Sequence, residues 1–293
     1  MRRDFLELIE RETIIFDGAM GTMLQMKGLA GGDCPELWNR KRPDVIREIH
    51  QAYFLAGCQV VETNTFGANS IKLKSYDLED QVYELNYLGA RLARESAPAE
   101  GFVAASIGPT GKFLEPLGNI SREKMYSVFK EQIEALIKGG VDIICIETMM
   151  DLEEAKLAVQ AAKENSSLPI IATMTFDLDR NGFRTMMGVD PKTAIKELGG
   201  AGVDVLGANC GNGPKEMVQL MKEMRDITSM PLIAQPNAGL PQLKEGKTVF
   251  SLNPEDFASY VRSFKEVGLN ILGGCCGTTP QHMKKVVEIV KGE

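Results

Sequence analysis

The sequence lacks an apolar run of the ~18 residues that a membrane-spanning helix requires. We also expect no signal peptide, because the start, Met1-Arg2-Arg3-Asp4-Phe5-Leu6-Glu7, carries charges where such a leader is apolar. No low-complexity tract occurs, which argues against disorder. Basic residues are not in excess, since 33 Lys and Arg against 40 Asp and Glu give a net charge of −7. We therefore expect a cytoplasmic protein that binds neither nucleic acid nor a membrane.

What the chain does contain is eight short runs of apolar and β-branched residues, spread over its whole length. Continuous apolar runs, rather than alternating ones, are typical of strands that are buried on both faces of a parallel sheet. The predicted strands are 13–17, 60–63, 102–106, 142–147, 169–173, 203–207, 231–235 and 269–273.

Helical patterns lie between these runs. Residues 121–138 place their apolar side chains on one face and stop at Gly139-Gly140. Asp151 with Glu154 predicts a capping box at the start of a helix that runs to about residue 165. Three further helix starts pair an N-cap residue with proline, and the second of these helices is expected to end at Gly268. The three pairs are Asp190-Pro191, Asn253-Pro254 and Thr279-Pro280.

Eight such strand-then-helix units predict one α/β domain over residues 1–293, a single (β/α)8 barrel of the TIM type. An open doubly wound sheet is the alternative, but it would need a nucleotide-binding loop. Segment 108–113 does not supply one, because Phe113 stands where Ser or Thr would hold magnesium. Segments 27–43 and 240–253 are expected to be irregular loops over the top of the barrel.

In a barrel of this type, polar residues at the carboxyl ends of the strands are the functional candidates. Nearly every predicted strand ends in such residues, so we expect a dense polar site at that end. They are Asp17, Glu62, Asn64, Ser106, Glu147, Thr173, Thr175, Asn209, Cys210, Gln235, Asn237, Cys275 and Cys276.

Three of the six cysteines, Cys210, Cys275 and Cys276, are among these strand ends. Three converging thiolates fit a soft tetrahedral ion, above all zinc, and leave one coordination position open. The residues alone leave two alternatives for the adjacent pair, a buried pair of small side chains or a redox-active pair. Of the other cysteines, we expect Cys58 and Cys145 in the core, and Cys34 has no assigned role.

A zinc ion held by three thiolates has a specific chemical use. The site keeps a net charge of −1, so it is a weak Lewis acid toward water. A substrate thiol in the fourth position is nevertheless deprotonated and stays electron-rich. The expected reaction is therefore alkyl transfer to a thiol, with the three cysteines as the catalytic residues.

Four motifs follow one another along the chain: Asp17-Gly18-Ala19-Met20-Gly21-Thr22, Glu62-Thr63-Asn64-Thr65-Phe66, Gly207-Ala208-Asn209-Cys210 and Gly273-Gly274-Cys275-Cys276-Gly277-Thr278-Thr279-Pro280. Together they resemble the homocysteine S-methyltransferase family over nearly the whole chain. Segments 108–112 and 235–241 are similar to the homocysteine-binding module of cobalamin-dependent methionine synthase. The resemblance implies zinc on the three cysteines, with homocysteine bound to it through sulfur.

The resemblance also implies how the rest of homocysteine is held. Backbone amides of loop 18–22 would meet its carboxylate, and Glu147, helped by Ser106, would pair with its ammonium group. Asp17 and Asn237 would order the loops and hydrogen-bond near the metal. Glu147 as a structural ion-pair partner and Asn209 as a helix cap remain alternatives. Three further residues are expected to support the site without touching the substrate, namely Glu62, Asn64 and Asn209. The two histidines, His50 and His282, are not expected to bind the metal.

The methyl donor implied by the resemblance is methylcobalamin. Neither histidine lies in the Asp-x-His-x-x-Gly motif of cobalamin modules, so a partner corrinoid protein or further cobalamin- and folate-binding domains would have to supply it. The chain is then expected to be an N-terminal module of a longer protein or one subunit of a multi-protein system. Betaine is disfavoured, because Gly67 and Thr148 stand where its branch is expected to have tyrosine and Trp38 alone makes no cage.

Other functions stay open. The main alternative is a homocysteine methyltransferase that uses S-methylmethionine and needs no partner, or methyl transfer to another small thiol. A zinc-sensing or scaffold barrel would bind zinc without a dependence on thiols. A thiol-redox enzyme using Cys275-Cys276 would be active without metal.

Overall fold

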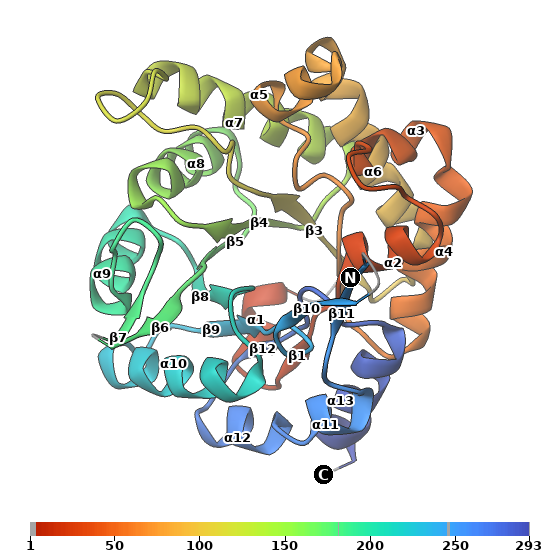
Figure 1. The fold of residues 1–293 in the computed structure, drawn as a ribbon, viewed down its shortest axis with the longest axis vertical. Coiled ribbons are helices and arrows are strands. Elements are labelled where there is room, and N and C mark those ends of the chain that lie inside the picture. Colours follow the sequence, from red (N-terminus) through yellow and green to blue (C-terminus); the bar gives the residue numbers. More distant parts are fainter. Residues whose placement is uncertain (1–3, 181, 245–246, 293) are drawn as a thin grey trace.

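The computed structural model describes residues 4–180, 182–244 and 247–292. Its centre is a sheet of eight parallel strands in the order β1-β12-β9-β8-β5-β4-β3-β2. A parallel bridge between Phe16 and Val60 joins the first strand to the last and closes the barrel (Figure 1). All eight strands lie on predicted runs, which confirms the barrel. Their bounds are β1 (Ile14–Ile15), β2 (Val60–Glu62), β3 (Phe102–Ile107), β4 (Ile143–Met149), β5 (Ile170–Met174), β8 (Val205–Asn209), β9 (Leu232–Gln235) and β12 (Ile271–Leu272).

Helices surround the barrel, and their caps follow the sequence closely. The predicted N-caps Asp190 and Asn253 each accept a hydrogen bond from a first-turn backbone amide, and Ser121 does the same at the start of α7 (Arg122–Gly139). The helices are α1 (Phe5–Ile9), α2 (Met20–Met26), α3 (Trp38–Lys41), α4 (Pro43–Leu55), α5 (Ser70–Leu73), α6 (Val82–Ser96), α7 (Arg122–Gly139), α8 (Leu152–Asn165), α9 (Pro191–Ala201), α10 (Pro214–Ile227), α11 (Pro254–Ala258), α12 (Val261–Glu266) and α13 (Pro280–Lys291), with short 3-10 turns at Pro35–Leu37, Lys74–Tyr76 and Glu79–Gln81. Within the described residues, no helix is both long and apolar enough to cross a membrane.

The capping box predicted at α8 forms only in part. Asp151 caps the helix by accepting hydrogen bonds from the amides of Glu153 and Glu154. The Glu154 carboxylate does not return the bond to Asp151, because Oε1 instead accepts from the backbone amide (2.7 Å) and hydroxyl (2.6 Å) of Thr110. Glu154 therefore anchors the loop after β3 to α8.

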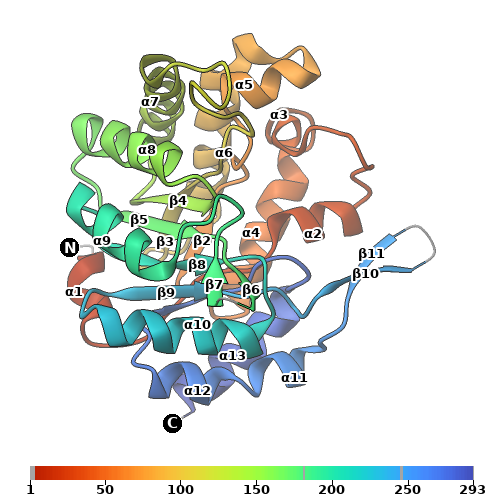
Figure 2. The same cartoon turned by 60° about the vertical axis from the view of Figure 1, so that its left-hand side comes forward.

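The amino-terminal end of the barrel interior is apolar and is closed by α1. Phe5 and Ile9 pack on inward-facing side chains such as Phe16 and Phe102. The ring centroids of Phe5 and Phe102 lie 5.6 Å apart in an edge-on contact. Figure 2 shows α1 at the end of the barrel opposite the hairpin of β10 (Pro241–Lys244) and β11 (Lys247–Phe250).

Three expectations were wrong in detail. Segment 27–43 is not wholly irregular, because it contains a 3-10 turn and α3 and reaches the first residue of α4. Segment 240–253 carries the β10–β11 hairpin, which its Lys, Glu and Gly residues conceal because they are poor strand formers. The helix after Asn253 divides into α11 and α12. A second hairpin, β6 (Asp177–Asp179) with β7 (Gly182–Arg184), was not predicted either.

Candidate functional site

The three predicted thiols meet at the carboxyl end of the barrel. Cys210 follows β8, and Cys275 and Cys276 follow β12. Their sulfur atoms all lie within 4.8 Å of one another, and all three residues are half-buried free thiols. A tetrahedral zinc site, with Zn–S bonds of ~2.3 Å, needs sulfurs about 3.8 Å apart, and that separation lies within this limit. The other three cysteines are buried elsewhere, as expected for Cys58 and Cys145.

The backbone around the thiols turns sharply to bring them together. Cys210 adopts a left-handed conformation with φ 60°, which is unusual for a residue other than glycine. Gly277 has φ 83°, and a Cβ atom there would lie 2.2 Å from the Phe250 ring. The glycine is therefore required both for the turn and for the close approach of the hairpin.

The electrostatics of the three sulfurs would suit a cation. Hydrogen bonds from the Cys275 and Cys276 thiols lower the pKa of Cys210, so one proton leaves the cluster readily. The bonds that these two thiols donate to Cys210 raise their own pKa values. Three thiolates can coexist here only if a positive ion neutralises them, and three soft sulfur donors fit a metal of the zinc type.

Glu147 lies beside this cluster, at the end of β4. Its Oε1 accepts a hydrogen bond from the Ser106 hydroxyl, and its Oε2 accepts from Asn209 Nδ2 at 3.1 Å. The side chain is 8% exposed, and no Lys or Arg forms an ion pair with it among the described residues. The alternative role of Glu147 as a structural ion-pair partner thus has no partner in the described chain.

Two more carboxyl groups share the same end of the barrel. Asp17 Oδ2 accepts a hydrogen bond from the Glu62 amide at 3.0 Å, and Glu62 Oε2 accepts from Gln235 Nε2 at 2.8 Å. Burial raises the pKa values of Asp17, Glu62 and Glu147, and the charge on Glu62 raises those of the other two further. Within the described chain, Asp17 Oδ1 and Glu62 Oε1 have no hydrogen-bond partner. Such a cluster favours a cationic group arriving in the site.

The loop of residues 18–22 packs against the segment that follows the paired cysteines. Ala19 N donates to Thr278 Oγ1 at 3.1 Å, and Gly277 N donates to Thr22 Oγ1 at 3.0 Å. A Cβ atom on Gly18 would lie 2.5 Å from Thr278 Oγ1, so this position requires glycine. Within the described chain, no side chain caps the N-terminus of α2, which begins at Met20 and includes Gly21.

Of the remaining residues considered from the sequence, one contacts the thiol cluster and the others have different roles. Asn237 hydrogen-bonds Cys210 and helps to lower the pKa of that thiol, so it lies at the cluster as expected. Asn64 instead donates to Pro35 O (2.9 Å) and Asn39 Oδ1 (3.0 Å), so it holds two loops together. Asn209 does not cap α10, whose N-cap is Gly213. His50 is buried, and His282 belongs to a capping box of α13.

The sequence reading left out several contacts of the site. Gln235, named only as a strand end, holds Glu62, and Thr173 donates to Asn209 Oδ1 at 2.7 Å. Thr278 joins loop 18–22 to the cysteine segment. The sequence places these residues at or near strand ends, but that position does not predict which side chains they hydrogen-bond.

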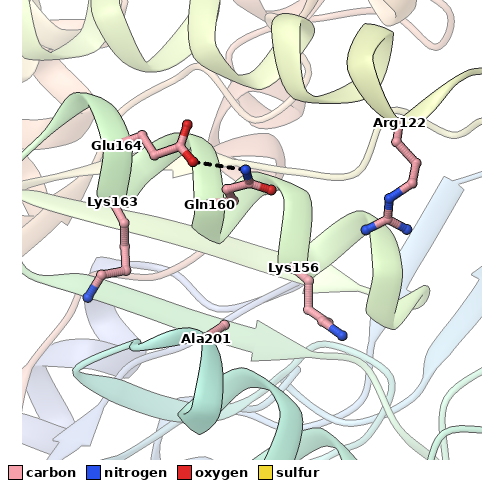
Figure 3. Close-up of a pocket in the computed structure, with 6 residues that line it drawn as sticks. All are labelled: Arg122, Lys156, Gln160, Lys163, Glu164 and Ala201. Atoms are coloured by element: carbon pink, nitrogen blue, oxygen red, sulfur yellow. Dashed lines mark hydrogen bonds between the residues drawn. The ribbon is translucent and has the colours of Figure 1, made fainter.

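A hollow of about 290 Å³ lies on the outer helical layer, where residues of α7, α8 and α9 line it (Figure 3). None of the groups described above is among its lining residues. Its cationic side chains are already engaged. Lys156 pairs with Glu153 and Glu197, and Lys163 donates to the Gly202 carbonyl. The chemistry that the sequence predicts therefore belongs to the barrel end and not to this hollow.

Comparison with known proteins settles the family. A profile of the family described as Homocysteine S-methyltransferase matches residues 14–290. The chain belongs to the homocysteine S-methyltransferase family. The resemblance of its four motifs is thereby confirmed over the whole barrel.

Relatives within this family include the methionine synthases of Mycobacterium tuberculosis and Mycobacterium leprae, each 34% identical over 307 aligned residues. These alignments cover 98% of this chain, but the chain spans only 25% of the relatives' length. The structure of the homocysteine methyltransferase MmuM from Escherichia coli in its metallated form superposes with a TM-score of 0.79. It is 24% identical and covers 96% of this chain and 98% of that one, which supports the fold.

Proposed function

We propose that this chain is the homocysteine-binding barrel of a methionine-forming methyltransferase, in which a zinc-activated homocysteine thiolate accepts a methyl group. The observation that carries the proposal is the meeting of three thiols, at one end of the barrel, with buried carboxyl groups that form no ion pair with a Lys or Arg among the described residues. One set suits a metal that binds a thiol, and the other suits an ammonium group. Homocysteine carries both a thiol and an ammonium group, and membership of its methyltransferase family supports it as the substrate.

Cys210, Cys275 and Cys276 would hold the zinc, which when bound supplies a Lewis acid that keeps a thiol ionised at neutral pH. The chain's own residues then hold the two cysteine segments in place. Gln235 O accepts from Cys210 N at 3.1 Å, and Pro236 O accepts from Cys275 N at 2.9 Å. Asn237 contacts Cys210 and fixes that sulfur further.

Glu147 would receive the substrate ammonium, held in position by Ser106 and Asn209. An ammonium ion there offsets the charge that makes this carboxylate costly to bury. The substrate carboxylate would meet backbone amides at the start of α2, in loop 18–22, where no side chain caps the helix among the described residues. Asp17 and Glu62 lie behind these groups and would make this end of the barrel favour a cation.

The methyl donor in this proposal is methylcobalamin, supplied by a partner corrinoid protein or by further cobalamin- and folate-binding domains. Two observations support it. The chain spans a quarter of the length of the methionine synthases that it resembles, and it has no Asp-x-His-x-x-Gly motif of its own. On this view residues 1–293 form one module of a longer protein or one subunit of a multi-protein system. S-methylmethionine is the alternative donor.

The test measures methionine formation by the zinc-loaded chain from homocysteine, with free methylcobalamin and S-methylmethionine in parallel reactions. Methionine from methylcobalamin alone supports the cobalamin branch. Methionine from S-methylmethionine makes the chain self-sufficient and overturns the need for a partner. No product from either donor, with zinc bound, contradicts the choice of thiol. Methionine formation by the metal-free protein would contradict the role of zinc, whereas thiol–disulfide exchange by that protein would favour a redox function of Cys275 and Cys276 instead.

A further inference from the structure

Asn209 lies between the carboxylate and the thiols. The residue ends β8, immediately before Cys210, and is 0% exposed. Its Nδ2 lies 3.1 Å from Glu147 Oε2, 2.7 Å from Thr148 Oγ1 and 3.9 Å from Cys275 Sγ. One amide nitrogen therefore reaches both the proposed ammonium site and a proposed metal ligand.

The orientation of this amide is fixed from its other side. Asn209 Oδ1 accepts from Thr148 N at 2.8 Å and from Thr173 Oγ1 at 2.7 Å. A rotated amide would place its oxygen against the Glu147 carboxylate and its NH₂ group against a backbone N–H donor. Nδ2 must therefore face Glu147 and Cys275.

The backbone on both sides of this amide is strained. Thr148, which follows Glu147, and Cys210, which follows Asn209, both have φ 60°. The left-handed region is costly for non-glycine residues, and especially for β-branched threonine. Thr148 keeps this conformation while both its N–H and its hydroxyl bond the Asn209 amide. The hydrogen bonds to Asn209 therefore hold Thr148 in its strained conformation.

We propose that Asn209 is a positioning residue that couples the ammonium end of the thiol substrate to the Cys275 sulfur. The inference rests on the proposed function above. Asn209 has two N–H bonds and three acceptors within reach, so it cannot serve all three well at once. An ammonium group on Glu147 competes for Oε2, which leaves an N–H free to strengthen its bond to Cys275.

This coupling has a direction. A hydrogen bond donated to a thiolate removes electron density that the sulfur would otherwise give to the metal. A thiol that carries an ammonium group should then be bound more firmly as its thiolate than the same thiol without one. Asn209 would thereby make the site selective for amino-acid thiols beyond the direct ion pair with Glu147.

The test uses the cobalt(II)-loaded protein with homocysteine and with 4-mercaptobutyrate, which is homocysteine without its amino group. The thiolate-to-cobalt absorption band and the calorimetric affinity are measured for both thiols. In the unchanged protein we expect two different band positions and a preference for homocysteine. In Asn209→Ala we expect the two bands to coincide and the preference to fall about 10- to 100-fold, as for the loss of a hydrogen bond to a charged group.

The control is Asn86→Ala, which removes another fully buried asparagine, one that lies on α6 and donates hydrogen bonds to the carbonyls of Ala68 and Val82. It should lower stability and leave the band difference unchanged. If Asn209→Ala does not fold, Glu147→Gln tests the same coupling, because it removes the charge for which the ammonium competes. Equal bands in the unchanged protein, or a difference that persists in either variant, overturn the coupling alone. If the loaded protein binds neither thiol, the proposed function fails with it.

Discussion

The two ends of the barrel interior are built from the same strands and differ completely in chemistry. At the amino-terminal end, Val60, Ala104 and Ile233 pack in an apolar cluster that Phe5 and Ile9 close. Two residues further along the same strands, the corresponding positions are Glu62, Ser106 and Gln235. Because strand side chains alternate, each pair faces the same interior. One end stabilises the fold, and the other carries groups that destabilise it until a ligand binds.

This contrast teaches where the barrel keeps its chemistry. Unpaired carboxyl oxygens, the left-handed residues Thr148 and Cys210, and three neighbouring thiols all occur at the carboxyl end. Each feature costs folding free energy, which the apolar end and the surrounding helices must supply. Changes at the two ends should therefore separate activity from stability.

The largest effect is expected from removing one thiol. Cys210→Ala leaves only two sulfur ligands, so zinc and methyl transfer should be lost together, with a fall in turnover of at least about 1,000-fold. Metal content by elemental analysis and methionine formation measure the two effects. The control Cys34→Ala removes a buried thiol that donates to Glu36, outside the cluster, and should keep its metal. A Cys210→Ala protein with both zinc and normal turnover would refute the ligand assignment.

The next effect concerns the opposite end. Phe5→Ala removes a ring that is 3% exposed and packs on Phe16 and Phe102, so unfolding free energy should fall by about 3–5 kcal/mol. Urea unfolding measures it. Turnover per folded molecule should stay unchanged, because the proposed site lies at the opposite end of the barrel. Leu55→Ala, at a side chain 88% exposed, should change stability by less than about 0.5 kcal/mol.

A smaller effect is expected for Glu147→Gln. The variant loses the charge that would receive the substrate ammonium, so homocysteine should bind about 10- to 100-fold more weakly. Calorimetry of the zinc-loaded protein measures this loss. Glu154→Gln is the matched control, because Glu154 is also a buried carboxyl group but bonds Thr110 away from the thiols. Equal losses in both variants would count against a specific ammonium site.

The fold could be predicted from the sequence because its causes are local. Each strand is a continuous apolar run, and caps such as Ser121 and Asp190 act within three residues. The three sulfurs were predictable because strand ends of a barrel converge. The bonds between Thr148 and Asn209 were not, because they join residues 61 positions apart. Their pairing depends on the register between strands and on the left-handed φ of Thr148, and neither can be predicted from composition or residue spacing.

The smallest effect is a change in pH dependence, and it sharpens the contrast between the two ends. Burial raises the pKa of Glu62, so the folded protein binds more protons than the unfolded chain above the ordinary glutamate pKa. Unfolding free energy of the metal-free protein should therefore fall as pH rises from about 4.3 through the raised pKa. Glu62→Gln removes this loss, so its gain in stability, about 1 kcal/mol, should be present at pH 8 and nearly absent at pH 4.

The opposite sign is expected at Glu95, where hydrogen bonds from Arg47 lower the pKa of an exposed carboxylate. Its contribution to stability is present above the unfolded pKa and is lost as pH falls through the folded pKa. Glu95→Gln should therefore cost stability at pH 7 and little at acid pH, by a small amount because the pair is solvent-exposed. Urea unfolding of Glu62→Gln and Glu95→Gln between about pH 4 and pH 8 measures the sign of each effect. If Glu62→Gln followed the sign of Glu95→Gln, the carboxyl end of the barrel would not be the destabilised end.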